Sequence, residues 1–267
     1  MTSAGTTPKR DLVLSPFGGD ARALLDAAIR AEDEGYDGVW VFDHVSSLAS
    51  LGAPGVGASR DPFAVLGAIA ARTTRLRIGT LVANIHNRHP AQLALALDTL
   101  TSLAPGRVVA GIGAGAGPGS PFAREDVALG RTPEPAARRR ALLEEHVAAL
   151  HAFWRGDDAV GSVATRGLTG IVTGSRPPIV VGAQTATTLE LAARIADGAN
   201  ITGATGSVLA ERVEHVREVA SQRPDGGSGF ELSVFVARSP DQVEAAGGTD
   251  SLELPDGVDR LTFLVRP

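Results

Sequence analysis

The sequence predicts a parallel α/β barrel of the (β/α)8 type. Short runs rich in Val, Ile and Leu alternate with longer segments of helical periodicity almost from end to end, as in repeated βα units around a parallel sheet. The 267 residues, 43% of them hydrophobic, can form one large core. No sequence repeat of about 20 to 50 residues is visible, which argues against a solenoid. A doubly wound open sheet stays the alternative, because the number of strands does not prove that a barrel closes.

The first half of the chain has well-marked element boundaries. Gly35 ends the first helix, and Asp61 followed by Pro62 is typical of an N-cap and the first helical residue. The expected strands are 12–15, 38–42, 76–83 and 108–112, and the expected helices are about 20–34, 62–72 and 90–103.

The second half continues the alternation after a long polar loop. We expect helices at 135–154, 185–195 and 208–220, and strands at 179–182, 198–202, 232–237 and 261–265. The last connection, 241–259, contains Gly247 and Gly248 and predicts only a short helix. Residues 1–10 are expected to be a flexible tail, and residues 11–267 a single domain.

Composition limits the partners and the location. The net charge is −5, and the only compact basic run, Arg138–Arg140, is most simply the solvated face of an amphipathic helix, so nucleic acid is not an expected partner. No cysteine is present, which excludes disulfides and thiolate metal sites. The sequence has no signal peptide or run of about 18 apolar residues. We therefore expect a cytoplasmic protein without a membrane partner.

Asp43 and His44 directly follow the apolar run 38–42. The carboxyl ends of barrel strands open onto the face where ligands bind. An imidazole can exchange a proton near neutral pH, and an adjacent carboxylate can orient it, so the pair suits proton transfer. The alternative is that Asp43 caps a turn and His44 makes one structural hydrogen bond.

Two segments could approach a ligand through their backbone. The glycines after strand 108–112 allow close approach, but Pro118 and a polar loop follow where a dinucleotide motif needs a helix, and no Walker lysine is present. At 183–188 a strand leads into a helix whose first turn is rich in threonine. Its N–H groups and hydroxyls could hold a phosphate, although simple N-capping explains the threonines equally well.

The remaining motifs argue against other chemistries. His86 and His89 follow the third strand, but they lack a nearby carboxylate or a second pair at ligand spacing. A histidine before proline is more often structural, so we predict no metal site. A Gly-x-Ser-x-Gly elbow is absent, which removes the basis for an α/β-hydrolase.

The order and spacing of several motifs resemble the bacterial luciferase-like superfamily of flavin- and F420-dependent enzymes. The resemblance covers about residues 11–203. It is carried by Ala31–His44, Asp61–Phe63, Thr74–Thr80, Arg88–Pro90, Gly106–Gly115, Pro177–Gly182 and Ala196–Asn200.

The resemblance implies a luciferase-like TIM barrel that holds a flavin or deazaflavin ring across the carboxyl ends of its strands. Similar proteins often have a non-proline cis peptide in the third strand, and the matching bond here is Leu81–Val82. His44 matches the histidine beside the ring in F420-dependent members. The other implied cofactor-binding residues are Ala114, Gly115, Ala116, Gly182, Ala183, Thr185 and Thr187.

Two departures from the superfamily pattern are visible. The stretch between Trp154 and Pro177 is shorter than the insertion that commonly covers the substrate in relatives. The sequence also ends at Pro267, directly after the last strand, whereas relatives generally add a helix. We therefore expect a barrel that is incomplete at its C-terminal helix, with a strand face that a homodimer would help to cover.

Three functions are compatible with these patterns. The first is an oxidoreductase that transfers hydride between F420 and a small organic substrate, with His44 managing protons and Asp43 supporting it. The second is an FMN-dependent luciferase-like monooxygenase. The third is a flavin-binding barrel without turnover, which the shortened loop and the missing helix favour.

Overall fold

The computed structural model describes residues 7–18, 20–45, 59–159 and 161–266. In these residues one sheet of nine strands has the order β3-β2-β1-β9-β8-β7-β6-β5-β4, and an additional β3–β5 pairing closes it. Every strand pair is parallel. The prediction of a closed barrel is confirmed, and the open-sheet alternative is wrong.

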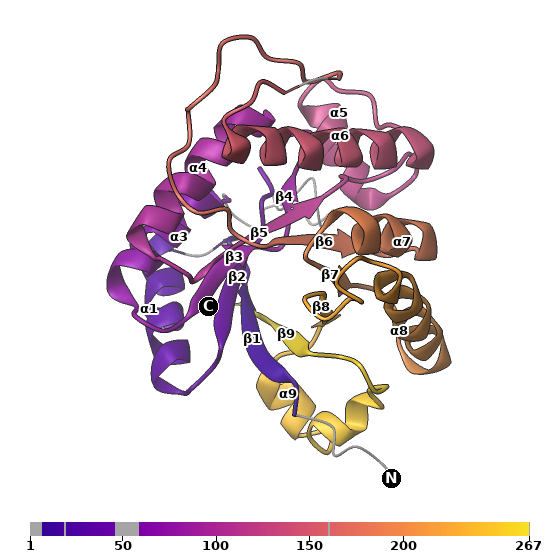
Figure 1. The fold of residues 1–267 in the computed structure, drawn as a ribbon. Coiled ribbons are helices and arrows are strands. Elements are labelled where there is room, and N and C mark those ends of the chain that lie inside the picture. The colour runs from indigo at the N-terminus through magenta and orange to yellow at the C-terminus, as the bar shows by residue number, and fades with distance from the viewer. Residues whose placement is uncertain (1–6, 19, 46–58, 160, 267) are drawn as a thin grey trace.

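The elements alternate as the sequence predicts, with helices surrounding the barrel (Figure 1). The strands are β1 (Lys9–Leu14), β2 (Gly38–Val41), β3 (Arg77–Thr80), β4 (Ala83–Asn84), β5 (Val108–Gly113), β6 (Ile179–Ala183), β7 (Gly198–Ile201), β8 (Glu231–Val236) and β9 (Arg260–Val265). The helices are α1 (Ala21–Asp33), α3 (Pro62–Arg72), α4 (Pro90–Leu103), α5 (Arg124–Ala128), α6 (Ala136–Arg155), α7 (Ala186–Ile195), α8 (Gly206–Ser221) and α9 (Pro240–Glu244). None of the helices in the described ranges is long and apolar enough to cross a membrane.

The predicted third strand, 76–83, is divided into two short strands. Strands β3 and β4 flank Leu81 and Val82, whose peptide bond is cis, as the resemblance implied. Strand β5 spans the interruption by pairing with both pieces, Ile78 opposite Val108 and Ala83 opposite Ile112. The nine strands therefore occupy eight positions around the barrel.

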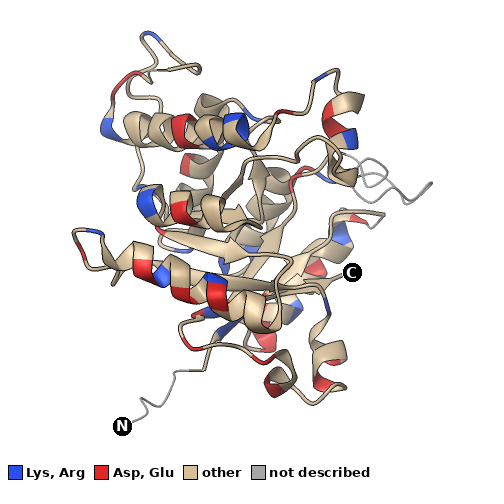
Figure 2. Ribbon diagram, turned by 90° about the vertical axis from the view of Figure 1, so that its right-hand side faces the viewer, with Lys and Arg blue, Asp and Glu red and all other residues tan. Residues whose placement is uncertain are grey.

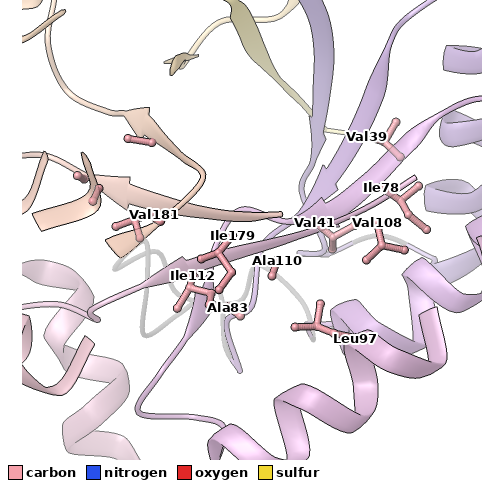
Figure 3. Close-up of a cluster of buried hydrophobic side chains, with 14 of the residues drawn as sticks. Val39, Val41, Ile78, Ala83, Leu97, Val108, Ala110, Ile112, Ile179 and Val181 are labelled. Carbon is pink, nitrogen blue, oxygen red and sulfur yellow. The ribbon is translucent and has the colours of Figure 1, made fainter. Parts of the chain in front are cut away.

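The hydrophobic core lies mainly between the barrel and its helices. Val39, Ile78 and Val108, from the adjacent strands β2, β3 and β5, belong to this core together with Leu97 of α4 (Figure 3). A second cluster fills the barrel interior: Val13, Trp40, Leu81, Val109 and Val180. Successive strand residues thus alternate between the two clusters.

A network of charged side chains closes the amino end of the barrel. Asp11 is buried, and it accepts hydrogen bonds from Trp40 Nε1 at 2.8 Å and from Arg260 Nη1 at 2.5 Å. Glu231 pairs with Arg77 and Arg260. Burial raises the pKa of Glu231, but the two guanidinium groups more than offset burial and hold that pKa below its ordinary value.

Three segments refine the sequence expectations. The sheet begins inside the expected tail, because Lys9 and Arg10 pair with Arg260 and Leu261. The long polar loop contains a 3-10 turn, η1 (Pro121–Ala123), and the short helix α5, which the sequence pattern did not predict. The last connection holds only α9 and η2 (Thr249–Leu252), in agreement with the expected short helix.

Candidate active site

The carboxyl ends of the strands surround a cavity of about 780 Å³. Every residue predicted for the site lines this cavity: Asp43, His44, Leu81, Val82, Ala114, Gly115, Ala116, Gly182, Ala183, Thr185 and Thr187. These residues come from segments far apart in the sequence, so the barrel topology itself brings them together. Their roles remain predictions.

His44 is held by a carboxylate from the polar loop. Its Nδ1 lies 2.6 Å from Glu125 Oε2, and Glu125, only 2% exposed, also accepts hydrogen bonds from Asn87 Nδ2 and the Val45 N–H. Burial raises the pKa of Glu125, but the His44 contact and the other two donors more than offset burial and lower it. An ionised Glu125 accepts a hydrogen bond from Nδ1–H, which leaves Nε2 as the free nitrogen.

Asp43 does not support His44 in the way that the sequence analysis expected. Its carboxylate accepts two hydrogen bonds of 2.9 Å from Arg88 and one from the Asn84 N–H. Arg88 also donates to Asp61, the N-cap of α3. Asp43 therefore ties β2 to the loop after β4, and Glu125 makes the contact that the adjacent residue was predicted to make.

Aromatic rings surround the His44 imidazole. The ring centroids of Phe17, Phe42 and Phe122 lie 6.0, 6.2 and 6.2 Å from that of His44. Phe235 of β8 packs edge-on against Phe42 at 6.2 Å. These four phenylalanines and Leu264 of β9 line one side of the cavity, here called the apolar half. It lies over the contiguous strands β8, β9, β1 and β2.

The opposite side of the cavity is built from residues without bulky side chains. Val82 packs so closely against Gly113 and Gly182 that a Cβ on Gly182 would lie 2.7 Å from Val82 Cγ1. Gly115 has a φ of +68°, and a Cβ there would meet the His86 ring at 2.5 Å. Glycine is thus required for both close approach and backbone conformation. We call this side, over β4, β5 and β6, the cradle half.

The cradle half ends in groups suited to an anion. Thr185 caps α7, and its hydroxyl lies 3.3 Å from that of Thr187. From α6, Arg139 donates to the Gly115 carbonyl at 2.6 Å and lines the cavity together with Arg140. Burial and the neighbouring Arg140 lower the pKa of Arg139. The expectation that Arg138–Arg140 forms a solvated face is therefore wrong for Arg139 and Arg140, and it holds for the exposed Arg138.

Asn200 of β7 brings a buried polar atom to the cavity. Its Nδ2 donates to Ser233 Oγ at 2.8 Å and to Thr262 Oγ1 at 3.2 Å. Both hydroxyls donate to backbone carbonyls, so they accept from the amide and fix its orientation. Asn200 Oδ1 is buried without a partner among the described protein atoms. Such an acceptor costs free energy until a donor reaches it.

Three histidines lie behind the cradle half. His89 caps α4 by accepting from the Ala91 N–H, which is the structural role predicted for it. His146 of α6 is buried, and burial, with smaller effects of His89 and His86, lowers its pKa to about 4. Within the described ranges, no group of three or more His, Asp or Glu side chains is arranged to bind a metal ion.

Sequence reasoning missed Glu125, Arg139 and Asn200. Glu125 does not directly follow a strand; it lies in α5, within the polar loop after β5. The tertiary path of this loop places Glu125 beside His44. Arg139 looked like one of three equivalent surface arginines, and helix periodicity could have separated it from Arg138. Asn200 is a polar residue inside an apolar strand, and strand alternation could have predicted that its side chain faces the barrel interior.

The model of the luciferase-like monooxygenase family matches residues 3–247 of the chain. The protein is a member of this family. The confirmed cis bond at Leu81–Val82 and the closed barrel agree with the superfamily resemblance seen in the sequence.

Curated relatives in the family cover part of the chain. It is 34% identical to the F420-dependent glucose-6-phosphate dehydrogenase of Nakamurella multipartita and 33% identical to that of Microbacterium testaceum, each over 180 residues. The matches cover 66% of this chain and 50% and 51% of those proteins. The chain therefore matches about half the length of these relatives.

Solved structures share the family fold. An F420-dependent secondary alcohol dehydrogenase in complex with an F420–acetone adduct has a TM-score of 0.74 at 23% identity, and the match covers 90% of this chain and 74% of the other. A riboflavin lyase with modified FMN and riboflavin has a TM-score of 0.70 at 16% identity, with coverage of 90% and 65%. At these identities the likeness concerns the barrel alone.

Proposed function

We propose that the protein is an F420-dependent oxidoreductase that transfers hydride between the deazaflavin and a small organic substrate. The observation that carries the proposal is the His44–Glu125 pair in a cavity whose other side is a cradle with cationic groups at its end. The names of the curated relatives support F420 as the cofactor.

The residues present fit such a cofactor. Gly113 and Gly182 pack directly against Val82, and a Cβ at either glycine would clash with the Val82 side chain. The buried Asn200 Oδ1 needs a hydrogen-bond donor, and a ring N–H group of the cofactor would supply one. Arg139 and the first turn of α7, with Thr185 and Thr187, would hold phosphate oxygens. Bound F420 would accept or return the hydride.

The side chains of the apolar half would handle the proton. By accepting a hydrogen bond from Nδ1–H, Glu125 would hold the His44 proton on Nδ1, so that Nε2 could accept the hydroxyl proton of an alcohol whose C–H bond supplies the hydride. The alcohol becomes a carbonyl compound, and the reverse reaction returns the same proton. Glu125 stabilises the imidazolium that forms, and the surrounding phenylalanines exclude water.

The first test is a titration of the purified protein with F420 and, separately, with FMN, followed by cofactor fluorescence. F420 binding at micromolar or lower concentration with much weaker FMN binding supports the proposal. Preferential FMN binding would move the protein to the flavin-dependent monooxygenases. Binding of F420 without any hydride exchange would favour a cofactor-binding barrel without turnover.

A further inference from the structure

The two halves of the cavity differ in chemistry, and this difference bears on the substrate. The cradle half carries Arg139, Arg140 and the first turn of α7 over β5 and β6. The apolar half carries four phenylalanines and Leu264 over β8, β9, β1 and β2. His44 stands at the end of β2, in the apolar half.

We propose that the substrate is a small, uncharged and largely apolar alcohol or ketone, and not a sugar phosphate. This inference rests on the proposed function, because it assigns the cradle half to the cofactor and the apolar half to the substrate. Phenyl rings about 6 Å from the His44 ring favour carbon next to the reacting carbinol. They offer no partner to additional hydroxyl groups, which would lose hydrogen bonds to water on binding.

Most of the cationic side chains that line the cavity lie away from the apolar half. Within the described residues, its lining contains three, Arg139, Arg140 and Arg266, and the first two belong to the cradle half. Arg266 follows β9, and its side chain is exposed at the rim. A phosphate dianion in the apolar half would thus meet one exposed guanidinium, although such groups are usually bound by several convergent donors.

The carboxylates that line the cavity are also committed. Asp43 is paired with Arg88, and Glu125 with His44. Neither carboxylate is free to recognise the hydroxyl groups of a sugar. Among the described residues of the apolar half, His44 Nε2 is the group suited to accept a proton, and Ser15 after β1 adds one hydroxyl to the lining. This small polar complement matches a substrate with a single hydroxyl or carbonyl group.

The test uses the full chain loaded with F420, after the fluorescence titration has shown that F420 binds. Hydride transfer and equilibrium binding are measured with 2-propanol, 2-butanol, 2-pentanol and cyclohexanol, and with glucose and glucose 6-phosphate. We expect binding and turnover of the neutral alcohols, with KM falling about three- to fourfold for each added methylene group.

Two outcomes would overturn this inference while leaving the proposed function in place. One is tighter binding or faster turnover of glucose 6-phosphate than of every alcohol. The other is the absence of alcohol binding up to the solubility limit in protein that binds F420. Failure to bind F420 at all would instead remove the proposed function, and with it this inference.

Variants locate the binding energy in the apolar half. Phe122 is 40% exposed, so Phe122→Ser is expected to fold and to raise the KM for cyclohexanol about tenfold with little change in kcat. Phe122→Leu should recover most of the affinity. Leu103→Ser, at an exposed position at the end of α4, is the matched control and should leave KM unchanged. An unchanged KM in Phe122→Ser, with circular dichroism confirming the fold, would contradict the assignment.

Discussion

The charged groups at the two ends of the barrel differ in how they are paired. At the amino end, Arg260 of β9 pairs with Asp11 of β1 and with Glu231 of β8, the strands on either side, and Arg260 and Asp11 are both buried. At the carboxyl end, His44 Nδ1 contacts Glu125, and Asn200 Oδ1 has no partner among the described protein atoms. The charged groups of the amino end therefore pair with one another, whereas His44 and Asn200 at the carboxyl end line a cavity.

The groups expected to stabilise the fold and the groups expected to bind a ligand thus lie at opposite ends of the barrel. Charges are mixed along the outer helices and loops (Figure 2), so the molecule's surface does not reveal which end is reactive. The two ends differ in which of their polar side chains are paired within the protein. Substitutions at the amino end should therefore change the free energy of unfolding, and substitutions at the carboxyl end should change binding and activity.

His44→Asn should produce the largest effect on activity. The Asn Nδ2 group replaces Nδ1 as a donor to Glu125 but supplies no proton acceptor to the cavity, so kcat should fall by about 10²- to 10⁴-fold. The free energy of unfolding should change by less than about 1 kcal/mol. Steady-state kinetics and urea denaturation measure the two quantities. A variant with the wild-type rate would remove His44 from the proposed chemistry.

Arg260→Met should show the reverse pattern at the amino end. Removing one member of a buried ion pair leaves Asp11 uncompensated, and we expect a loss of about 3–5 kcal/mol in unfolding free energy. The KM and kcat of the folded fraction should stay within about twofold. Arg155→Met breaks an exposed ion pair and serves as control, with a change below about 1 kcal/mol. Equal effects of the two substitutions would contradict the assigned role of burial.

His146 should make stability depend on pH. Its pKa is lowered to about 4 in the folded protein, against about 6.5 when unfolded. Between these values the unfolded state binds the proton and the folded state does not, so stability falls as pH decreases from 6.5 to 4, by roughly 3 kcal/mol in total. Urea midpoints at pH 7 and 4.5 should show most of this loss in the wild type. His146→Leu should flatten the slope, and an unchanged slope would exclude His146 as its source.

Arg139→Gln should have the smallest of these effects, and we expect it to change only the affinity for the cofactor. Loss of one guanidinium near the first turn of α7 is expected to weaken F420 binding about tenfold. Arg138→Gln, one residue away on the exposed face of α6, should leave affinity unchanged. Fluorescence titrations at two salt concentrations would separate the variants, because the wild type should lose more affinity with salt than Arg139→Gln. Identical titrations for the two variants would contradict a cofactor contact by Arg139.

The sequence was most informative where chemistry follows a strand. His44, Gly182 and Thr185 each end or follow an apolar run, so barrel topology alone placed them in one cavity. Local patterns could not identify the partner of His44, since Glu125 lies 81 residues away in a loop whose path depends on tertiary contacts. The prediction that Asp43 supports His44 rested on their adjacency in sequence. Successive residues at a strand end point in different directions, and Asp43 pairs with Arg88 instead. The apolar half likewise required four strands to be assembled before its phenylalanines met.

Glu125, the partner of His44, does not belong to a strand of the barrel. Glu125 is carried by α5, a short helix outside the barrel wall, which Arg131 anchors through Asp126. A change in this loop would alter the group that faces Nδ1 without disturbing any strand pairing. Substitutions in this loop are therefore expected to change the proposed proton transfer by His44 while the strands of the barrel keep their register.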